Sequence, residues 1–487
     1  MAVGRLVGGL CEILGERGVV REPSVMAPYL QDWRGLARGE AIAVARPTCT
    51  AEVAAVVRLC AETGTAVVPQ GGVTGLVNAS APHGPRAMLV LSLDRMGRVV
   101  EVDPVNLTLT AEAGCILQEA QRAAAAVGLR LPLKIGAEGS ARLGGVLATN
   151  AGGNLTIRYG NTRALCLGLE VVLPDGRVLS ELEGLRKNNT GYDLKHLFIG
   201  AEGTLGVMTR ATLELVPAPS QTATVFLALA ELDGLFDLLG RFRREVGDHL
   251  SVFELLPRVA LELVVAHVPG TRDPLAATAD WYVLVQVETA QRRPDLDELV
   301  GEVLADALAA ELITDGVVAQ SEAQAGELVK LREQIAEGQK AEGFGVRHDV
   351  AVPVDRLVDF IRAGTALVAE AAPGARVVAF GHVGDGNVHF NVQSPAGDPA
   401  APGLRAAADA LGERVHDLAV EMGGTFSAEH GIGRMKRAAF ARHRPLARVL
   451  CGDVKRWLDP QGIMNPGVIF AEGGEDAAAD GAAPGAR

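Results

Sequence analysis

Apolar and polar positions alternate in short runs along the first half of the chain. The runs AIAVARP, AVVP, MLVLSL, VVEVDP, LTLTAEAG and LGVMTRATLELVP each predict a strand, because they are short and rich in β-branched residues. Residues 48–64 and 116–127 carry apolar side chains at helical spacing, and Thr50 with Glu52 marks the start of the first helix. The run LGLEVVLPDGRVL predicts a hairpin that turns at Pro174-Asp175-Gly176.

The second half of the chain has longer helical stretches and fewer glycines. Helices are predicted over residues 231–247, 296–312, 321–341, 355–371 and 403–422. The runs VFLAL, WYVLVQVE and ARVVAFGHV predict strands between them, so we expect an α+β domain with helices over an antiparallel sheet. The segment Pro217-Ala218-Pro219-Ser220 is the predicted boundary between the halves. The last 17 residues, AEGGEDAAADGAAPGAR, are small and acidic and predict a disordered tail.

Composition narrows the class of protein. The 487 residues are 48% hydrophobic, which is enough for two or three cores. The net charge of -13 argues against nucleic acid or an anionic membrane surface as a partner, since both require a basic face. No run approaches the length of a membrane span. The N-terminus carries Glu12 and Glu16 and predicts an amphipathic surface helix rather than a signal peptide, so a cytoplasmic protein is expected.

The six cysteines are dispersed, and no two of them form a CxxC pair. This spacing excludes an iron–sulfur cluster of the ferredoxin kind and a four-thiolate zinc knuckle. It predicts buried, unpaired thiols in a reducing compartment.

Three glycine-rich segments adjoin predicted strands, at residues 69–77, 136–153 and 200–207. Neighbouring glycines let the backbone turn tightly and bring several N–H groups close to an anion, so the segments favour a phosphate-bearing cofactor. An ordinary glycine-rich hairpin is the alternative for the first segment. The chain has no GxGxxG fingerprint and no Gly-Lys pair, which argues against Rossmann and P-loop sites.

Histidines gather in two short C-terminal motifs. In GHVGDGNVHFN, the Gly-rich turn predicts a hairpin with His382 and His389 on neighbouring strands, and Asn391 shares the face of His389. The motif SAEHG places Glu429 and His430 forty residues later. Two His and one Glu suit Zn²⁺, with Mn²⁺ as second choice, and leave positions open for a substrate. The alternative is that each histidine makes only a local hydrogen bond.

The motifs PQGGxTGL, GGxxATNAGG and GAEGTLGV resemble the FAD-binding segments of PCMH-type (vanillyl-alcohol oxidase-like) flavoproteins. They are most similar to the D-2-hydroxy acid dehydrogenase branch, which contains the flavoprotein component of glycolate oxidase, D-lactate dehydrogenase and D-2-hydroxyglutarate dehydrogenase. The resemblance implies an α+β protein with a two-subdomain PCMH-type FAD-binding domain, an α+β cap domain with an antiparallel sheet, and a C-terminal segment that returns to the flavin. Noncovalent FAD is expected, because the first loop lacks the His to which some relatives attach the flavin, and the nearest is His83.

The same resemblance implies domain boundaries and cofactor contacts. The expected domains are an N-terminal segment 1–37, the FAD-binding domain 38–217, a substrate or cap domain with the metal site 218–455, a C-terminal FAD-contacting segment 456–470 and a tail 471–487. FAD contacts are expected at Pro69, Gln70, Gly71, Gly72, Thr74, Gly75, Leu76, Gly136, Gly139, Ser140, Gly144, Asn150, Gly153, Glu202, Gly203, Val207 and Asn465.

By resemblance, His382, His389 and Glu429 are metal ligands and His430 is the catalytic base. The chemistry supports this division. The hydroxyl and a carboxylate oxygen of a 2-hydroxy acid chelate one metal, which lowers the hydroxyl pKa so that a neutral imidazole can take the proton. The C2 hydride then moves to flavin N5 and leaves a 2-oxo acid.

The resemblance implies that Arg332, Arg347, Asn391 and His430 bind the substrate, with Arg332 pairing with its carboxylate. The alternative for Arg332 is a helix-surface pair with Glu333 or Glu337. Two positions depart from the D-2-hydroxyglutarate enzymes. This chain has Ala336 where those enzymes have a Thr, and Arg347 where relatives have a Lys. D-Lactate, D-2-hydroxyglutarate, glycolate or a similar acid is therefore expected.

Two alternatives keep the fold and change the role. One is a non-redox flavoenzyme similar to alkylglycerone-phosphate synthase, and the other is an FAD-binding component of a multisubunit complex of the glycolate oxidase type. The paired metal motifs favour the dehydrogenase. The electron acceptor is left open between an electron-transfer flavoprotein, a quinone and a cytochrome, and a homodimer is also left open.

Overall fold

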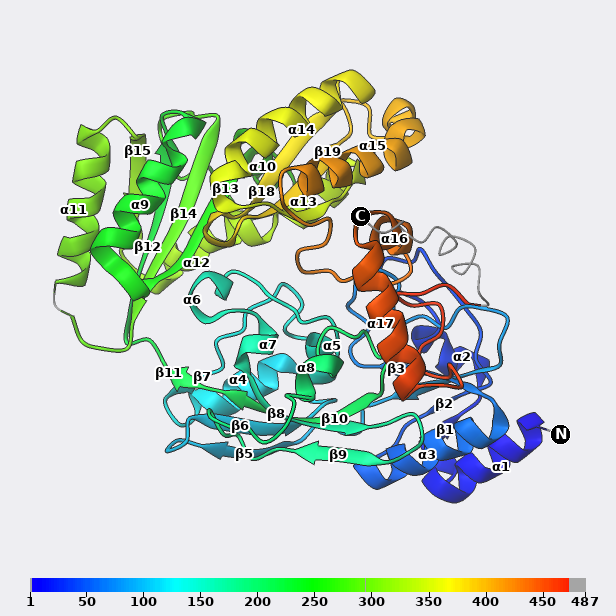
Figure 1. The fold of residues 1–487 in the computed structure, drawn as a ribbon. Coiled ribbons are helices and arrows are strands. Elements are labelled where there is room, and N and C mark those ends of the chain that lie inside the picture. The colour runs from blue at the N-terminus through cyan, green and yellow to red at the C-terminus, as the bar shows by residue number, and fades with distance from the viewer. Residues whose placement is uncertain (1, 294, 473–487) are drawn as a thin grey trace, which may run out of the picture. The chain divides into compact units, whose positions relative to one another are not determined.

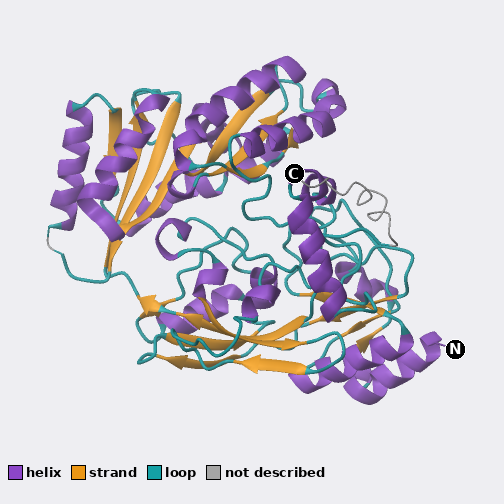
Figure 2. Cartoon of the chain, in the orientation of Figure 1, coloured by secondary structure: helices purple, strands orange, loops and turns teal. Residues whose placement is uncertain are grey.

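The computed structural model describes residues 2–293 and 295–472, which form two compact units (Figure 1, Figure 2). Unit 1 contains the chain up to Ala151, residues 161–217 and the chain from Glu429 onward. Unit 2 contains residues 152–160 and 218–428. Each unit is therefore assembled from segments that are separate in the sequence.

A four-stranded sheet forms the N-terminal layer of unit 1, in the order β1-β2-β4-β3. Its strands are β1 (Val19–Val20), β2 (Ala43–Ala45), β4 (Met88–Ser92) and β3 (Ala66–Gln70). Strands β2 and β3 both pair parallel to β4, and parallel neighbours need a crossover connection. Helix α3 (Thr50–Thr63) provides that crossover between β2 and β3.

Local signals set the bounds of α3. The Glu52 carboxylate accepts hydrogen bonds from the amide and the hydroxyl of Thr48, just before the first turn. Gly64 ends the helix in the left-handed region, at φ 67°. Helix α1 (Ala2–Leu14) packs against α3 and buries Leu6 and Leu10 in the same core, which confirms the predicted N-terminal helix.

A five-stranded antiparallel sheet forms the second layer of unit 1, in the order β5-β6-β10-β8-β9. Its strands are β5 (Val99–Asp103), β6 (Thr108–Glu112), β10 (Val207–Glu214), β8 (Cys166–Val172) and β9 (Val178–Glu181). The β8–β9 pair confirms the hairpin predicted around Pro174-Asp175-Gly176. The remaining elements of unit 1 are α2 (Pro23–Met26), α4 (Leu117–Ala125), β7 (Leu129–Arg130), α5 (Leu143–Ala148), α7 (Thr162–Leu165), α8 (Lys195–Phe198), β11 (Val216–Pro217), α16 (Arg437–His443) and α17 (Pro445–Leu458).

Unit 2 is built on one antiparallel sheet, in the order β15-β12-β14-β13-β18-β19-β16, with β17 also pairing with β19. The strands are β12 (Gln221–Leu229), β13 (Leu250–Pro257), β14 (Trp281–Thr289), β15 (Ile313–Val318), β16 (Gly345–Val346), β17 (Asp349–Ala351), β18 (Arg376–His382) and β19 (Asn387–Gln393). Its helices are α6 (Thr156–Tyr159), α9 (Leu235–Val246), α10 (Arg258–His267), α11 (Leu296–Ala309), α12 (Glu322–Glu333), α13 (Ile335–Glu342), α14 (Leu357–Ala371) and α15 (Pro402–Glu421). The predicted α+β architecture is confirmed.

Unit 2 differs from the predicted elements in one helix that is split and in several elements that were not predicted, among them β13, β15, β16, β17 and α10. The single helix predicted over 321–341 is two helices, α12 and α13, because Gln334 leaves the helical region at φ -93° and ψ 7°. Strand β13 was not predicted. Its run LSVFELLP is buried at every position, and a continuous apolar run has no alternation that would separate a strand from a buried helix.

The remaining sequence predictions concern helices and thiols. Among the described residues, no helix combines the length and the apolar character that crossing a membrane requires. All six cysteines are unpaired, as expected, but the prediction that they are buried holds only for Cys60, Cys115 and Cys166, and Cys451 is exposed. Burial raises the thiol pKa of Cys60 and of Cys166 to about 12. Residues 473–487 of the predicted disordered tail lie outside the described residues.

Candidate active site

The first two glycine-rich segments lie directly against each other in unit 1. Strand β3 ends at Gln70, whose buried side-chain amide donates to the carbonyls of Tyr29 and Ser80 at 2.7 and 2.6 Å. A Cβ on Gly72 would lie 2.1 Å from the carbonyl oxygen of Ser140, which belongs to the second segment. Only glycine permits this approach of the two backbones.

Glu202 and Asn465 join the third segment to the C-terminal part of the chain. The Glu202 carboxylate accepts hydrogen bonds from the amides of Ile432 and Gly433, both at 2.8 Å. The side-chain amide of Asn465 donates to the carbonyls of Glu202 and Ala79, at 2.7 and 3.0 Å. The structure therefore brings predicted cofactor segments from four parts of the sequence together in one unit.

Strained backbone conformations are concentrated in and beside the predicted FAD segments. Nine non-glycine residues among those described have φ above zero, and five lie in or beside the predicted FAD segments. These five are Val73, Asn78, Asn150, Glu202 and Asn465. Residues other than glycine rarely adopt this conformation unless the surrounding structure imposes it, and such strain is concentrated at ligand sites.

The unit 1 segments fit FAD in shape and in polarity. A Cβ placed on Gly75, Gly136 or Gly145 would meet no atom within 4 Å, so these backbones border open space. Within the described part of the chain, the side-chain oxygens of Gln70 and Asn465 are buried and accept no hydrogen bond. Such acceptors suit the hydroxyl and amino donors of a dinucleotide.

The other predicted FAD contacts lie on several elements. Thr74 and Leu76 lie in the loop after β3, Gly139 in the loop before α5, Gly144 within α5, and Val207 at the first position of β10. Gly153 belongs to unit 2, unlike the remaining predicted contacts.

Glu202 is expected to make the stability of unit 1 depend on pH. Burial raises its pKa from 4.5 to about 7, although the Ile432 and Gly433 amide bonds oppose part of that shift. Because the pKa is raised in the folded state, this group favours folding at low pH, and its contribution disappears as the pH rises through about 7. Glu202→Gln should therefore flatten the dependence of the melting temperature on pH between about 5 and 8. Glu101→Gln, at an exposed position, is the control, and equal slopes for both variants would contradict the assignment.

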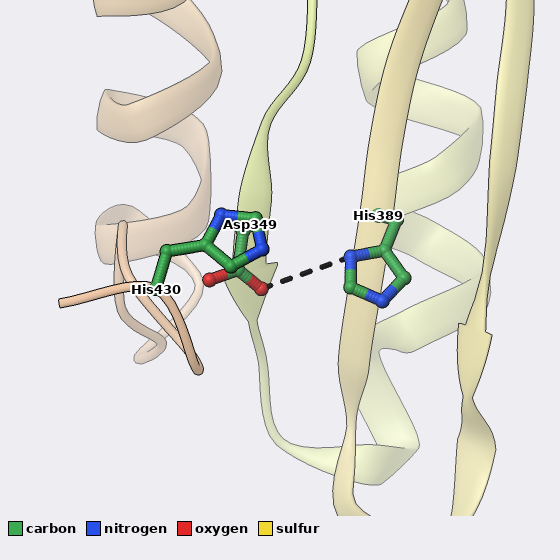
Figure 3. Close-up of side chains that lie close together, drawn as sticks. All are labelled: Asp349, His389 and His430. Carbon is green, nitrogen blue, oxygen red and sulfur yellow. Dashed lines mark ion pairs between the residues drawn. The ribbon is translucent and has the colours of Figure 1, made fainter. Parts of the chain in front are cut away.

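The histidine motif of unit 2 forms the predicted hairpin. Strands β18 and β19 pair antiparallel on either side of a turn at Gly386, which has φ 78°. The ring centroids of His382 and His389 lie 5.7 Å apart, so the imidazoles converge as expected. His389 Nδ1 lies 3.9 Å from a carboxylate oxygen of Asp349 on β17 (Figure 3).

A buried carboxylate that the sequence analysis did not single out fixes His382. Glu254 on β13 accepts from His382 Nδ1 through one oxygen and from Arg332 Nε at 2.5 Å through the other. Burial opposes ionisation of Glu254, but the charges and hydrogen bonds of Arg332 and His382 outweigh it and lower its pKa to about 2. Because Nδ1 is bound to Glu254, Nε2 is the nitrogen of His382 that could hold a metal.

The structure contradicts the surface alternative for Arg332. Its side chain is only 9% exposed, pairs with Glu254 rather than with Glu333 or Glu337, and stacks 4.7 Å from the ring centre of Phe380. The two further predicted substrate residues on this unit differ in their exposure. Asn391 is buried and donates to Gln339 Oε1 at 2.9 Å, whereas Arg347 is exposed and donates to the carbonyl of Ala336 at 3.2 Å.

Glu429 and His430 follow directly on a segment anchored in unit 2. The amide of Ala428 donates to the Asp349 carbonyl at 3.3 Å. Glu429 is the next residue, so its Cα lies about 3.8 Å from that of Ala428. Ligand atoms of His382, His389 and Glu429 lie within 4.8 Å of one another, and so do those of Asp349, His389 and His430. Imidazole nitrogens with a carboxylate are a donor set that Zn²⁺ and Mn²⁺ accept.

Gly384 in the hairpin turn is expected to tolerate no side chain. A Cβ there would lie 1.9 Å from Cδ1 of Ile157 on α6. Gly384→Ala should therefore lower the free energy of unfolding by about 1–3 kcal/mol, as overpacked cores do. Ile157→Ala should restore most of that loss in the double variant, measured by denaturation in urea. Gly403→Ala, where a Cβ meets no atom within 4 Å, is the control, and a loss there as large would contradict the packing explanation.

Sequence comparisons agree with this architecture. Residues 41–180 match the FAD binding domain, and residues 218–469 match the C-terminal domain of FAD linked oxidases. A D-2-hydroxyglutarate dehydrogenase of Xanthomonas citri is 37% identical over 451 residues, covering 92% of this chain and 93% of that protein. The mitochondrial D-2-hydroxyglutarate dehydrogenase of Bos taurus is 39% identical over 451 residues, covering 92% and 80%. A D-2-hydroxyglutarate–pyruvate transhydrogenase of Saccharomyces cerevisiae is 33% identical over 452 residues, covering 91% and 89%.

Solved structures share the fold at low sequence identity. p-Cresol methylhydroxylase has a TM-score of 0.76, with 16% identity over 96% of this chain and 97% of that one. Alkyldihydroxyacetonephosphate synthase has a TM-score of 0.73, with 16% identity over 95% and 84%. The chain belongs to the FAD-linked oxidases with a PCMH-type FAD-binding fold. It is an FAD-dependent oxidoreductase.

Proposed function

We propose that the protein oxidises a D-2-hydroxy acid to the 2-oxo acid, with noncovalent FAD as the hydride acceptor and a divalent metal held by His382, His389 and Glu429. Zn²⁺ is the first choice of metal and Mn²⁺ the second. The observation that carries the proposal is the Glu254–His382 hydrogen bond, because a carboxylate that fixes the outer nitrogen of an imidazole is typical of metal-binding histidines. The relatives, which are named for D-2-hydroxyglutarate, supply the substrate class.

Each group has a distinct part in the proposed reaction. When bound, FAD supplies the hydride acceptor and the metal supplies Lewis acidity at the substrate hydroxyl. His430 takes the hydroxyl proton, since a neutral imidazole is a suitable base near neutral pH. Glu254 holds the ring of His382, and Arg332 and Asn391 orient the substrate.

D-2-Hydroxyglutarate is the first substrate to test, because three relatives that span nearly the whole chain carry its name. D-Lactate and glycolate come next, because Ala336 offers no hydroxyl for a second carboxylate and Arg347 is a different cation from lysine. The electron acceptor and a cytoplasmic location stay predictions, and some relatives are mitochondrial.

A panel of paired D- and L-2-hydroxy acids, with and without a chelator, tests the proposal. We expect a D-acid to reduce the bound flavin, seen as loss of its visible absorbance, and we expect the chelator to abolish this reduction until Zn²⁺ or Mn²⁺ is restored. A rate indifferent to the chelator would overturn the metal assignment. Failure of every acid to bleach metal-replete protein would favour the non-redox alternative. Turnover of the purified chain with an artificial acceptor dye would argue against a role that depends on other chains.

A further inference from the structure

Strand β19 is almost entirely buried, and one of its two faces is polar along its whole length. The apolar face belongs to the core of unit 2 and is formed by Val388, Phe390 and Val392. The polar face is formed by Asn387, His389, Asn391 and Gln393. The three amide side chains of this face are each no more than 5% exposed. A buried amide destabilises the fold unless it forms hydrogen bonds, so the role of this face depends on the bonds that its amides form.

The side-chain amide of Gln393 is oriented by two backbone carbonyls. Gln393 Nε2 donates to the carbonyls of Gln339 at 3.2 Å and of Phe344 at 3.3 Å. Gln339 is among the final residues of α13, whose carbonyls have no partner within the helix. Because a carbonyl can only accept, the NH2 group of Gln393 must face these two oxygens, and Oε1 must face the other way.

The orientation of Gln393 determines that of Gln339 and then that of Asn391. Gln393 Oε1 accepts from Gln339 Nε2 at 3.4 Å, so Gln339 must direct its own side-chain oxygen elsewhere. That oxygen accepts from Asn391 Nδ2 at 2.9 Å, and Asn391 therefore turns Oδ1 away from Gln339. The three amides form a relay with one direction, which the backbone at the end of α13 sets.

Asn391 lies in the same part of unit 2 as His389, a proposed metal ligand. It follows His389 by two residues and so shares its face of β19. The ring centre of Phe380 lies 5.1 Å from that of His389 and 4.7 Å from Cζ of Arg332. Because Nδ2 is bonded to Gln339, the groups that Asn391 can offer a substrate are Oδ1 and its second N–H.

We propose that Gln339 and Gln393 are positioning residues, which fix the side-chain amide of Asn391 in the one orientation that binds the substrate. This inference rests on the proposed function, in which Asn391 orients a D-2-hydroxy acid. Turning the amide of Asn391 over would bring Oδ1 against the side-chain oxygen of Gln339, and the bond to Gln393 prevents Gln339 from turning over with it. A fixed amide holds the acid in one pose, which keeps its reacting carbon aligned.

Packing of α13 against β19 does not by itself require these amides. Apolar side chains of similar volume hold buried elements together without the penalty of burying polar groups. The neighbouring strand also makes room for the relay, because Gly345 on β16 pairs with Gln393 and a Cβ there would lie 3.0 Å from Gln393 Oε1. A network that needs this accommodation and ends at Asn391 favours a role in the site over packing alone.

The test compares Gln339→Glu and Gln339→Met with the unchanged protein over a range of pH. A protonated carboxyl can donate to Gln393 Oε1 and accept from Asn391 Nδ2, as glutamine does, whereas a carboxylate can only accept. Burial raises the pKa of the introduced carboxyl. Gln339→Glu should therefore match the unchanged protein at about pH 5 and lose about tenfold in kcat/KM at about pH 9, and Gln339→Met should lose about tenfold at both. The reaction measured is flavin reduction by D-2-hydroxyglutarate or, if that acid is inert, by D-lactate.

A double variant and an exposed control separate positioning of Asn391 from other effects. Asn391→Ala should lower kcat/KM, and adding Gln339→Met to it should cause no further loss, because both changes act through the same amide. The absorbance of bound FAD and the zinc content should stay unchanged in every variant. Gln291→Glu, at an exposed position of the same unit, should match the unchanged protein at every pH.

Melting temperatures test the relay without any substrate. A raised carboxyl pKa favours folding at low pH, and this contribution is lost as the pH rises through the raised value, so the deficit of Gln339→Glu relative to the unchanged protein should grow with pH. Such a deficit together with an unchanged kcat/KM would show a purely structural network and overturn the proposal. Additive losses in the double variant would overturn it as well. If no D-2-hydroxy acid reduces the flavin of the unchanged protein, the proposed function falls by itself, because the melting temperatures test the relay independently.

Discussion

Replacing Glu254 with alanine is expected to cost unit 2 about 3–5 kcal/mol of stability, the usual loss when one partner of a buried ion pair is removed. Glu254 is 1% exposed and is the carboxylate shared by Arg332 and His382. Its removal leaves the buried guanidinium of Arg332 without this partner and frees the ring of His382 to turn. Glu254→Gln keeps the shape and one acceptor, so its loss should be smaller.

Denaturation in urea and zinc binding, measured on the same samples, check this prediction. Glu370→Ala is the control, because Glu370 pairs with Arg414 at an exposed position, where an ion pair contributes little to stability. If Glu254→Ala proves as stable as Glu370→Ala and binds zinc equally well, then Glu254 does not position the metal site.

Replacing His430 with glutamine is expected to lower the rate of flavin reduction by about 10²–10⁴-fold, the range for loss of a general base. Glutamine can still form hydrogen bonds but cannot accept the proton at neutral pH. The absorbance of bound FAD and the metal content should remain unchanged, because His430 is neither a predicted FAD contact nor a predicted metal ligand. The acidic limb of the pH–rate profile should also disappear.

His83→Gln is the matched control for this variant, since His83 is exposed and lies outside the predicted contacts. A residual rate within about tenfold of the unchanged protein would show that another group, such as Asp349 or solvent, takes the proton.

Local sequence patterns were sufficient for the histidine hairpin and for the glycine segments. His382 and His389 flank a turn that needs Gly386 at positive φ, and a Gly-rich turn between two apolar runs is a strong local signal. Gly72 is similar, because the close approach of the Ser140 carbonyl leaves no room for a side chain. At the hairpin the constraint acts within a few residues, whereas at Gly72 the partner Ser140 is distant in the sequence and only the glycine-rich run itself is visible there.

Contacts between distant parts of the chain could not be predicted in this way. Glu254 lies 128 residues before His382 and 78 before Arg332, inside an apolar run whose single acidic residue carries no sign of its partners. Glu202 is a predicted FAD contact, and nothing near it in the sequence indicates that its carboxylate accepts from backbone amides 230 and 231 residues later. Such pairs depend on the tertiary fold, which local periodicity does not encode.

The division of the chain has a consequence for its synthesis. The polypeptide passes between the two units four times, so neither unit is complete until late in translation. Ile157, in the segment 152–160, packs against Gly384 in the 382–389 hairpin. More than 200 further residues must be synthesised before that hairpin is available. Strand β3 must wait longer still, because Val67 pairs with Met464. A nascent chain released early would therefore expose both cores, and C-terminal truncations should be cleared by proteases rather than accumulate as a stable FAD-binding fragment.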